Sequence, residues 1–242
     1  MLYIKKTQPS QELVNFITAE KAKFQTEGKL NKHPSYEVLQ SDISYKLLRH
    51  QLFKEQRGLC CYCMRKIGVD NSNVEHFLPQ SIFPENEVDY YNLYLACRHS
   101  YKKLKDNQHC DIVKGNELIS KYIGFLHNNK KCEDLIQYTE DGYILPKKQN
   151  YITRIKFYQN YSILTPQEKE LLSTIEVLNL NCPSLVNERF KFIKTEAKFK
   201  PFVDSISDVL TLRKILSNYE NQTIAFAGVA IYFLKERLKQ IP

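Results

Sequence analysis

The chain has 242 residues, of which 43% are hydrophobic and 26% are charged, a balance typical of globular proteins. Its length allows one sizeable core, or a small module with helical flanks. The longest apolar run, residues 224–234, has eleven residues, whereas a membrane-spanning helix needs about 20, and no signal-peptide pattern opens the sequence. We therefore expect a cytoplasmic protein with no membrane association, which excludes channels and disulfide-stabilised secreted scaffolds.

The net charge of +8 is distributed unevenly along the chain. Residues 1–59 carry 10 basic and 6 acidic groups, residues 60–120 carry 7 and 8, and residues 121–242 carry 18 and 13. Basic flanks around a slightly acidic middle favour a polyanionic partner that the flanks would hold. A pI near 9 is also common among proteins without such a partner, so charge alone leaves the question open.

Residues 1–58 are predicted to form an N-terminal helical region of two helices. Ser10 and Ser35 each precede a run with apolar positions at helical spacing, and both are suitable N-cap residues. The second helix is expected to continue to Gly58, which would occupy the C′ position. The apolar faces of both helices are interpreted as core.

Residues 59–120 differ in composition from the rest of the chain and form a predicted central module. They hold five of the seven cysteines and three of the six histidines. Short β-rich runs around "NVEHF" and "NLYLA" predict two strands, and a short helix is expected to begin near Asp111.

Residues 121–242 are predicted to form a hairpin followed by helices. The run "LIQYTEDGYILP" has an Asp-Gly turn between two β-rich halves, which is typical of a hairpin. In "TPQE", Thr165 is the predicted N-cap of a helix, and Pro166 and Glu168 complete a capping box. Further helices are expected over 184–199, 206–217 and 223–240. The predicted fold class is therefore α+β and mostly helical.

The spacing of the cysteines indicates a metal site in the central module. Cys60 and Cys63 are separated by two residues, which lets both thiolates reach one tetrahedral ion. Cys97 and Cys110 are the candidates for a second pair, with twelve polar and basic residues between them. We expect the four thiolates to bind a structural zinc ion, because a small module buries too little surface to be stable alone.

Neighbouring histidines leave one ligand open to an alternative. His99 and His109 each lie near a predicted cysteine ligand, and either could replace one thiolate. The remaining cysteines, Cys61, Cys132 and Cys182, are expected to be buried packing residues.

Four short motifs follow one another in the central module: "CCYC", "VEHFLP", "NL" and "CDIVKG". Their order resembles that of the HNH endonucleases, whose pattern is Cys-x-x-Cys, an acidic residue with His, Asn-Leu, and Cys-Asn (or His)-x-x-Lys-Gly. With "YEVLQSDISYKLLRHQLFKEQRGLCCYCMRKI", they look like the retron- and Septu-associated (PtuB-like) subfamily over about residues 1–120. The resemblance implies a zinc-stabilised ββα-metal (HNH) module inserted between N- and C-terminal helical regions.

The resemblance also implies roles for residues between the cysteines. His76 would be the general base, because a neutral imidazole with a pKa near 6.5 can accept a proton from water. Glu75 and Asp111 would bind a catalytic Mg²⁺ or Mn²⁺ through oxygen. Asn92 would bond across the loop and orient His76, and Lys114 would contact a phosphate. Asp111 stands where the family commonly has His or Asn, so we expect retained activity with a changed metal preference.

A basic cluster between the second pair of cysteines is a candidate substrate contact. Lys102, Lys103 and Lys105 would bind phosphates, although such lysines singly are more often a solvated face. The sequence contains no base-reading element, so weak or no sequence preference is expected.

The predicted function is a metal-dependent endonuclease that hydrolyses DNA. The resemblance implies an anti-phage defence complex with a PtuA-type ATPase, and with a retron reverse transcriptase and its DNA product as further candidate partners. Two alternatives are left open: the same site acting on RNA such as tRNA, and a non-catalytic zinc module that only binds nucleic acid. An intact base and acid pair argues against the latter, because a binding module has no use for a general base.

Overall fold

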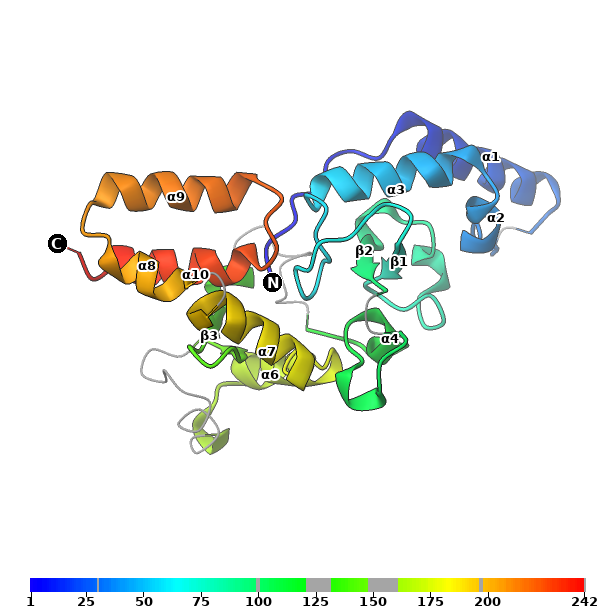
Figure 1. Cartoon of the computed structure of the whole chain (residues 1–242). Helices are drawn as coiled ribbons and strands as arrows, with labels where there is room; N and C mark the ends of the chain where they lie inside the picture. Colours follow the sequence, from blue (N-terminus) through cyan, green and yellow to red (C-terminus); the bar gives the residue numbers. More distant parts are fainter. Residues whose placement is uncertain (30, 99–100, 121–131, 148–160, 196–197, 242) are drawn as a thin grey trace.

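A computed structural model describes residues 1–29, 31–98, 101–120, 132–147, 161–195 and 198–241. In these residues the fold is α+β, as predicted, and about half helical with two small antiparallel sheets (Figure 1). The α-helices are α1 (Gln11–Thr26), α2 (Tyr36–Gln40), α3 (Ile43–Glu55), α4 (Asp111–Lys114), α6 (Pro166–Val177), α7 (Pro183–Phe190), α8 (Phe199–Ser205), α9 (Val209–Asn221) and α10 (Ala227–Leu238). The strands are β1 (Ser72–His76), β2 (Leu93–Cys97), β3 (Ile136–Tyr138) and β4 (Ile144–Pro146). Among the described helices, each is too short or too polar to cross a bilayer.

The predicted N-terminal helices form, but the second is divided in two. Ser10 and Ser35 both act as N-caps, as expected. The helix that follows Ser35 ends at Gln40, however, and a new helix begins after Asp42. The Asp42 carboxylate accepts the backbone N–H of Ser44 at 2.8 Å. An Asp side chain that binds a nearby backbone N–H favours a new helix start over continuation, so the prediction of a single helix was wrong.

Helix α3 ends in a Schellman motif that reverses the chain toward the central module. The backbone N–H of Arg57 donates to the carbonyl of Lys54 at 3.0 Å, and that of Gly58 donates to the carbonyl of Phe53 at 2.9 Å. These are the two bonds of the motif, and they place Arg57 at C′, with a φ of 52°, and Gly58 at C″. The prediction that Gly58 occupies C′ was therefore wrong by one residue.

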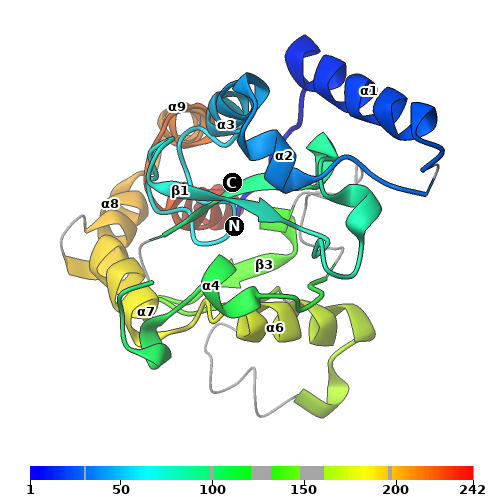
Figure 2. The same cartoon turned by 90° about the vertical axis from the view of Figure 1, so that its right-hand side faces the viewer.

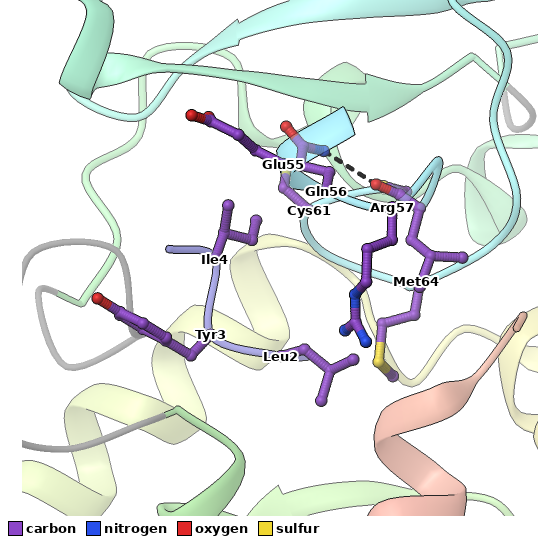
Figure 3. A pocket seen from close by; sticks show the side chains of 10 residues that line it. Leu2, Tyr3, Ile4, Glu55, Gln56, Arg57, Cys61 and Met64 are labelled. Atoms are coloured by element: carbon purple, nitrogen blue, oxygen red, sulfur yellow. Dashed lines mark hydrogen bonds between the residues drawn. The ribbon is translucent and has the colours of Figure 1, made fainter. Parts of the chain in front are cut away.

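Gln56, inside this turn, fastens the end of α3 to the central module. Its side-chain amide donates to the carbonyls of Leu59 and Leu95, and its oxygen accepts the Leu95 N–H at 2.6 Å. Figure 3 shows the first residues of the chain, Leu2 to Ile4, running beside this turn. The cavity between them measures about 20 Å³, room for roughly one water molecule, so the region is packing and not a ligand site.

Strands β1 and β2 form the central hairpin and divide the module into two faces. In their antiparallel register Glu75 lies opposite Tyr94, and His76 lies opposite Leu93. Because side chains alternate along a strand, Glu75 and His76 leave opposite faces of the sheet. The face with His76 is covered by α1–α3, whose core side chains Leu13, Leu48 and Leu52 pack on Leu93 and Leu95. Helix α4 lies on the other face (Figure 2).

The larger core joins the central module to the C-terminal helices. Met64 is the link: its carbonyl accepts the N–H of Phe226 at 3.1 Å, and its sulfur accepts the N–H of Gly228 at 3.3 Å. Most of α10 is buried, so the apolar run at 224–234 is core. Residues from all three predicted regions contribute to this core.

In the C-terminal half the predicted capping box and hairpin form, and one helix, α8, was not predicted. Thr165 forms the predicted capping box with Glu168, and the β3–β4 hairpin closes at the predicted Asp-Gly turn. The helix expected over 184–199 ends at Phe190 and passes into a π-helical turn, Lys191–Thr195, after which the unpredicted α8 begins. The start of α9 is set by Asp208, whose carboxylate accepts the N–H groups of residues 210 and 211.

The hairpin turn at Gly142 generates a stability prediction. Gly142 has a φ of 92°, and a Cβ there would lie 2.9 Å from the backbone nitrogen of Phe190 in α7. Gly142→Ala therefore adds both backbone strain and overpacking, and it should lower the free energy of unfolding by about 3 kcal/mol or more in urea titrations.

Gly28→Ala is the matched control, because Gly28 has a φ of 67° but no atom within 4 Å of its built Cβ. It should cost only about 1 kcal/mol, the backbone term alone. Equal losses in the two variants would show that close packing of the turn on α7 contributes nothing.

Candidate metal centre and active site

Four cysteine sulfurs from three segments of the chain meet in the interior. The ligand atoms of Cys60, Cys63, Cys97 and Cys110 lie within 4.8 Å of one another, and all four residues are buried. The Sγ atoms of Cys60 and Cys110 are 3.9 Å apart, and those of Cys63 and Cys97 are 3.6 Å apart. A tetrahedron with zinc–sulfur bonds of about 2.3 Å has edges of about 3.8 Å, so the group fits such an ion. The predicted clustering of these four cysteines is confirmed, and the cluster could bind a metal such as zinc.

Local backbone geometry turns each thiol inward. Residues 60–65 form a tight turn, the knuckle. The Cys60 N–H donates to the carbonyl of Arg65 at 2.9 Å, and Met64 closes the turn with a φ of 62°. Cys97 ends β2 and Cys110 directly precedes α4. Cys110 also has a positive φ, of 65°, a strained conformation that is held by the hydrogen bond from its N–H to the carbonyl of Leu178.

His109 contacts the thiolates as a hydrogen-bond donor and is not part of the four-ligand group. Its Nε2 lies 2.9 Å from Nη1 of Arg65, and because a guanidinium only donates, Nε2 must be the acceptor. The ring proton is then on Nδ1, which lies 3.1 Å from the sulfur of Cys110. Arg65 also forms an ion pair with Glu188 of α7. His99, the other alternative ligand, lies outside the described residues.

The described end of the insert between Cys97 and Cys110 docks on the C-terminal helices. The side chain of Asn107 accepts the N–H of Ser184 at 2.9 Å, and Asn179 donates to the carbonyl of Gln108 at 2.8 Å. These bonds connect the residues just before Cys110 to α7 and to the end of α6. Docking therefore supports the fourth cysteine from outside the module.

Glu75 lies in a buried polar pocket between the knuckle and α4. Its Oε1 accepts the hydroxyl of Tyr62 at 2.9 Å and forms an ion pair with Nζ of Lys114 at 2.9 Å. Burial, with hydrogen bonding to Asp111 and the negative charge of Asp111, raises the pKa of Glu75 to about 8, and Lys114 opposes that rise. The two predicted acids are thus brought together, although they are 36 positions apart in the sequence.

Asp111 is held by two residues that sequence reasoning missed. Asn73 donates to its Oδ2 at 2.8 Å, and the hydroxyl of Tyr101 donates to the same oxygen at 2.5 Å. Asn73 stands two positions before Glu75 in β1, so the strand period of two was a signal that could have found it. Tyr62, between the two knuckle cysteines, and Tyr101, in the insert, had no such local signal.

His76 lies at the end of β1, on the face toward α2. Its Nε2 is 2.9 Å from the carbonyl oxygen of Glu87, which can only accept, so the proton is on Nε2 and the neutral ring has its lone pair on Nδ1. The ring of Tyr36 contacts it edge-to-face, with centroids 4.7 Å apart. Burial lowers the pKa of His76, and the charges of Lys114 and Asp111 are near enough to shift it in opposite directions. His76 is therefore a neutral, oriented imidazole.

Asn92 was expected within the second strand. It lies instead at the end of a 3₁₀ turn, Tyr90–Asn92, directly before β2. Its oxygen accepts the N–H of Leu78 at 2.7 Å, and its amide donates to the carbonyls of Leu78 and Asn86. It thus ties together the loop that follows His76. Glu87, whose carbonyl holds the His76 ring, is the next residue after Asn86, so Asn92 supports that ring indirectly.

The lysines predicted to contact phosphate differ in exposure: Lys114 is buried, whereas two of the three lysines of the insert are exposed. Lys114 was expected to reach a phosphate, but its side chain is 2% exposed and folds back onto β1, where it binds Glu75 and the carbonyl of His76. In this structure Lys114 is therefore an internal ion-pair partner, and its contact with a phosphate stays a prediction. Lys102 and Lys105 are exposed and Lys103 is half-buried, all in the insert that begins beside Tyr101.

No family model matches the sequence. Among curated proteins, the chain is similar to one named "Retron Vc95 putative HNH endonuclease" from Vibrio cholerae serotype O1 biovar El Tor, with 28% identity over 153 residues. The match covers 62% of this chain and spans 64% of the length of that relative. At this modest identity, the similarity supports a relationship to HNH endonucleases and thus to nucleases.

The thiolate cluster generates a prediction on metal content. Purified protein should contain about one zinc ion per chain by elemental analysis, and Cys60→Ala should lose it together with cooperative thermal unfolding, because the ion stabilises the module.

Cys61→Ala is the matched control for this experiment. Cys61 is adjacent and equally buried, but its sulfur is not part of the group formed by Cys60, Cys63, Cys97 and Cys110. That variant should retain the full zinc content. Zinc retained by the Cys60 variant, or absent from the wild type, would contradict the assignment.

Proposed function

We propose that this chain is a metal-dependent HNH endonuclease that hydrolyses phosphodiester bonds, with residues 59–120 as its ββα-metal module between helical regions 1–58 and 121–242. The observation that carries the proposal is the meeting of Glu75 from β1 with Asp111 from α4, one residue along the strand from His76, whose oriented imidazole leaves the opposite face of the hairpin. The similarity to a protein named as an HNH endonuclease is a second, independent support.

The two acids fit a hard divalent cation. The two carboxylates meet in one pocket, where burial and the neighbouring Asp111 raise the pKa of Glu75 and Lys114 opposes that rise. Glu75 and Asp111 would hold Mg²⁺ or Mn²⁺ through their oxygens. Bound there, the ion would supply positive charge to the scissile phosphate and to the leaving oxygen.

The remaining chemistry belongs to residues of the chain itself. His76 accepts the proton of the attacking water on Nδ1, and its Nε2–H remains on the carbonyl of Glu87, which stabilises the protonated ring. Asn73 and Tyr101 both donate to Oδ2 of Asp111 and so fix the orientation of this carboxylate. Because β1 pairs only with β2 among the described strands, its second edge is unpaired, and a phosphate at that edge would be accessible from both faces.

We further propose DNA as the substrate and an anti-phage defence complex as the setting. The relative's name places that protein in a retron, which favours a retron setting for this chain also, with a PtuA-type ATPase and a reverse transcriptase as partners. The net charge of +8 favours a polyanionic substrate. Lys102, Lys103 and Lys105 begin at Tyr101, which binds Asp111, and would extend the substrate contact from that acid.

Substitution of the base tests the enzymatic assignment. His76→Ala should reduce cleavage of plasmid DNA by about 100-fold or more with Mg²⁺ or Mn²⁺, because the substitution removes general-base catalysis. Since burial lowers the pKa of His76, the wild type should retain a neutral base down to pH values below 6.5. Cleavage rates at saturating metal between pH 5 and pH 8 measure both effects.

His50→Ala is the matched control, because His50 is an exposed histidine of α3 and should leave the rate unchanged. Total RNA is incubated in parallel. Cleavage of RNA but not DNA would identify the other polymer, unaltered cleavage by the His76 variant would refute the base, and zinc-loaded protein that binds but never cuts nucleic acid would favour the non-catalytic module.

The raised pKa of Glu75 predicts competition between protons and the divalent ion. Because burial and Asp111 raise the pKa of Glu75 to about 8, protons compete with a cation for this carboxylate, so the half-saturating Mg²⁺ concentration should fall as pH rises from 6.5 to 8. Glu75→Gln should abolish this dependence and most of the activity, whereas exposed Glu117→Gln should preserve both. A Mg²⁺ requirement that is independent of pH in the wild type would contradict the role of Glu75.

A further inference from the structure

An open groove of about 480 Å³ lies along the edge of β1 that pairs with no other described strand, between β1, α2 and α3. Its volume is within the range of about 300–1,000 Å³ typical of sites for small organic ligands. The carboxylate of Asp70 and the amide of Gln40 line it together with two tyrosine rings, two guanidinium groups and a second amide: Tyr36, Tyr45, Arg49, Arg98 and Asn73. The proposed chemistry uses none of these residues as a reacting group.

The groove touches the candidate active site at two points. Tyr36, at one end, contacts the ring of His76 with centroids 4.7 Å apart. Asn73, in its wall, donates to Asp111 at 2.8 Å. A ligand in the groove would therefore contact two residues, Tyr36 and Asn73, that touch the proposed base and one of the proposed acids.

The tyrosine rings are held in place before any ligand arrives. The hydroxyls of Tyr36 and Tyr45 are 3.0 Å apart, and their rings pack edge-to-face. Arg49 fixes Tyr45 by donating to its hydroxyl at 3.2 Å, and it donates to the carbonyl of Ser72 at 3.0 Å. Rigid aromatic rings lose little entropy when they stack on a ligand.

The two arginines differ in whether their guanidinium groups are accessible to a ligand. Arg49 already hydrogen-bonds to the hydroxyl of Tyr45 and to the carbonyls of Ser72 and Val69. Arg98, directly after β2, is exposed at the rim of the groove and presents a guanidinium suited to a phosphate. The groove thus combines aromatic faces with one accessible cationic group.

We propose that this groove binds one unpaired nucleotide next to the scissile phosphate, so that the substrate is a single strand or an unpaired end. The base would stack on Tyr45 or Tyr36, and Arg98 would bind the neighbouring phosphate. A paired base is already stacked within its duplex and has no free face for a tyrosine. This inference rests on the proposed nuclease function, and it adds the structural state of the substrate.

The test measures binding separately from cleavage. In the His76→Ala background, fluorescence anisotropy with labelled ten-nucleotide DNA and RNA strands and a blunt DNA duplex should show that single strands bind more tightly than the duplex. Tyr45→Leu should weaken single-strand binding by about ten-fold, because base–aromatic stacking is lost, whereas Tyr45→Phe should preserve it.

Arg98→Ala keeps the test decisive if Tyr45→Leu fails to fold, because Arg98 is exposed. It should weaken single-strand binding several-fold and reduce the salt dependence, while exposed Arg213→Ala on α9, with the same charge change, should do neither. Tighter binding of either DNA or RNA single strands supports the groove and identifies its polymer.

Equal affinity for single strands and duplex, or binding unaffected by Tyr45→Leu and Arg98→Ala, would overturn the proposal. The two proposals fail separately. If His76→Ala abolishes cleavage and the groove variants bind normally, the nuclease stands without the groove. If the groove variants lose binding but the wild type never cuts, the groove stands without the nuclease.

Discussion

Four sulfur atoms from three segments of the chain lie within 4.8 Å of one another. The strands of the central hairpin have five residues each and α4 has four, so these elements bury too little surface to be stable alone. Because Cys97 ends β2 and Cys110 precedes α4, convergence of the sulfurs also fixes α4 against the hairpin. Asp111 directly follows Cys110, and its position opposite Glu75 depends on this arrangement.

The thiolate cluster and the acid pair are coupled through very short stretches of chain. Tyr62, between two of the cysteines, donates to Glu75, so a change in the knuckle would shift the acid directly. On its other side the cluster is surrounded by donors: Arg65, paired with Glu188, binds His109, which in turn donates to Cys110. Groups that surround metal ligands in this way orient them and balance their negative charge.

Buried charge at the candidate site is satisfied in a way that favours one geometry. Lys114 and Glu75 are 2% and 4% exposed, and each would be costly to bury without the other. The lysine also binds the carbonyl of His76, so one ammonium group positions the acid and the end of the strand that carries the base. A side chain that seemed to be a phosphate ligand is thus part of the framework of the site.

Local signals predicted much of the fold correctly. The N-caps at Ser10 and Thr165, the hairpin at the Asp-Gly turn and the two central strands depend on contacts within a few residues, which a sequence displays directly. Errors occurred where two local preferences competed. At Asp42 a side chain–backbone bond ended a helix that the apolar pattern would have continued, and at Arg57 a residue other than glycine took the left-handed position.

The sequence by itself determined the α+β class and four cysteines as the candidate metal group, because spacing and residue type indicate both. It gave the two acids and the histidine as candidates through motifs that resemble those of a known family. Only the tertiary structure decided that Lys114 turns inward, that His109 donates to a sulfur, and that Tyr36, Tyr45 and Arg98 line a groove beside His76. These outcomes depend on partners from distant segments. These side-chain positions follow from packing and from the hydrogen bonds that buried polar groups require. Neither produces a periodic pattern in the sequence from which the positions could be predicted.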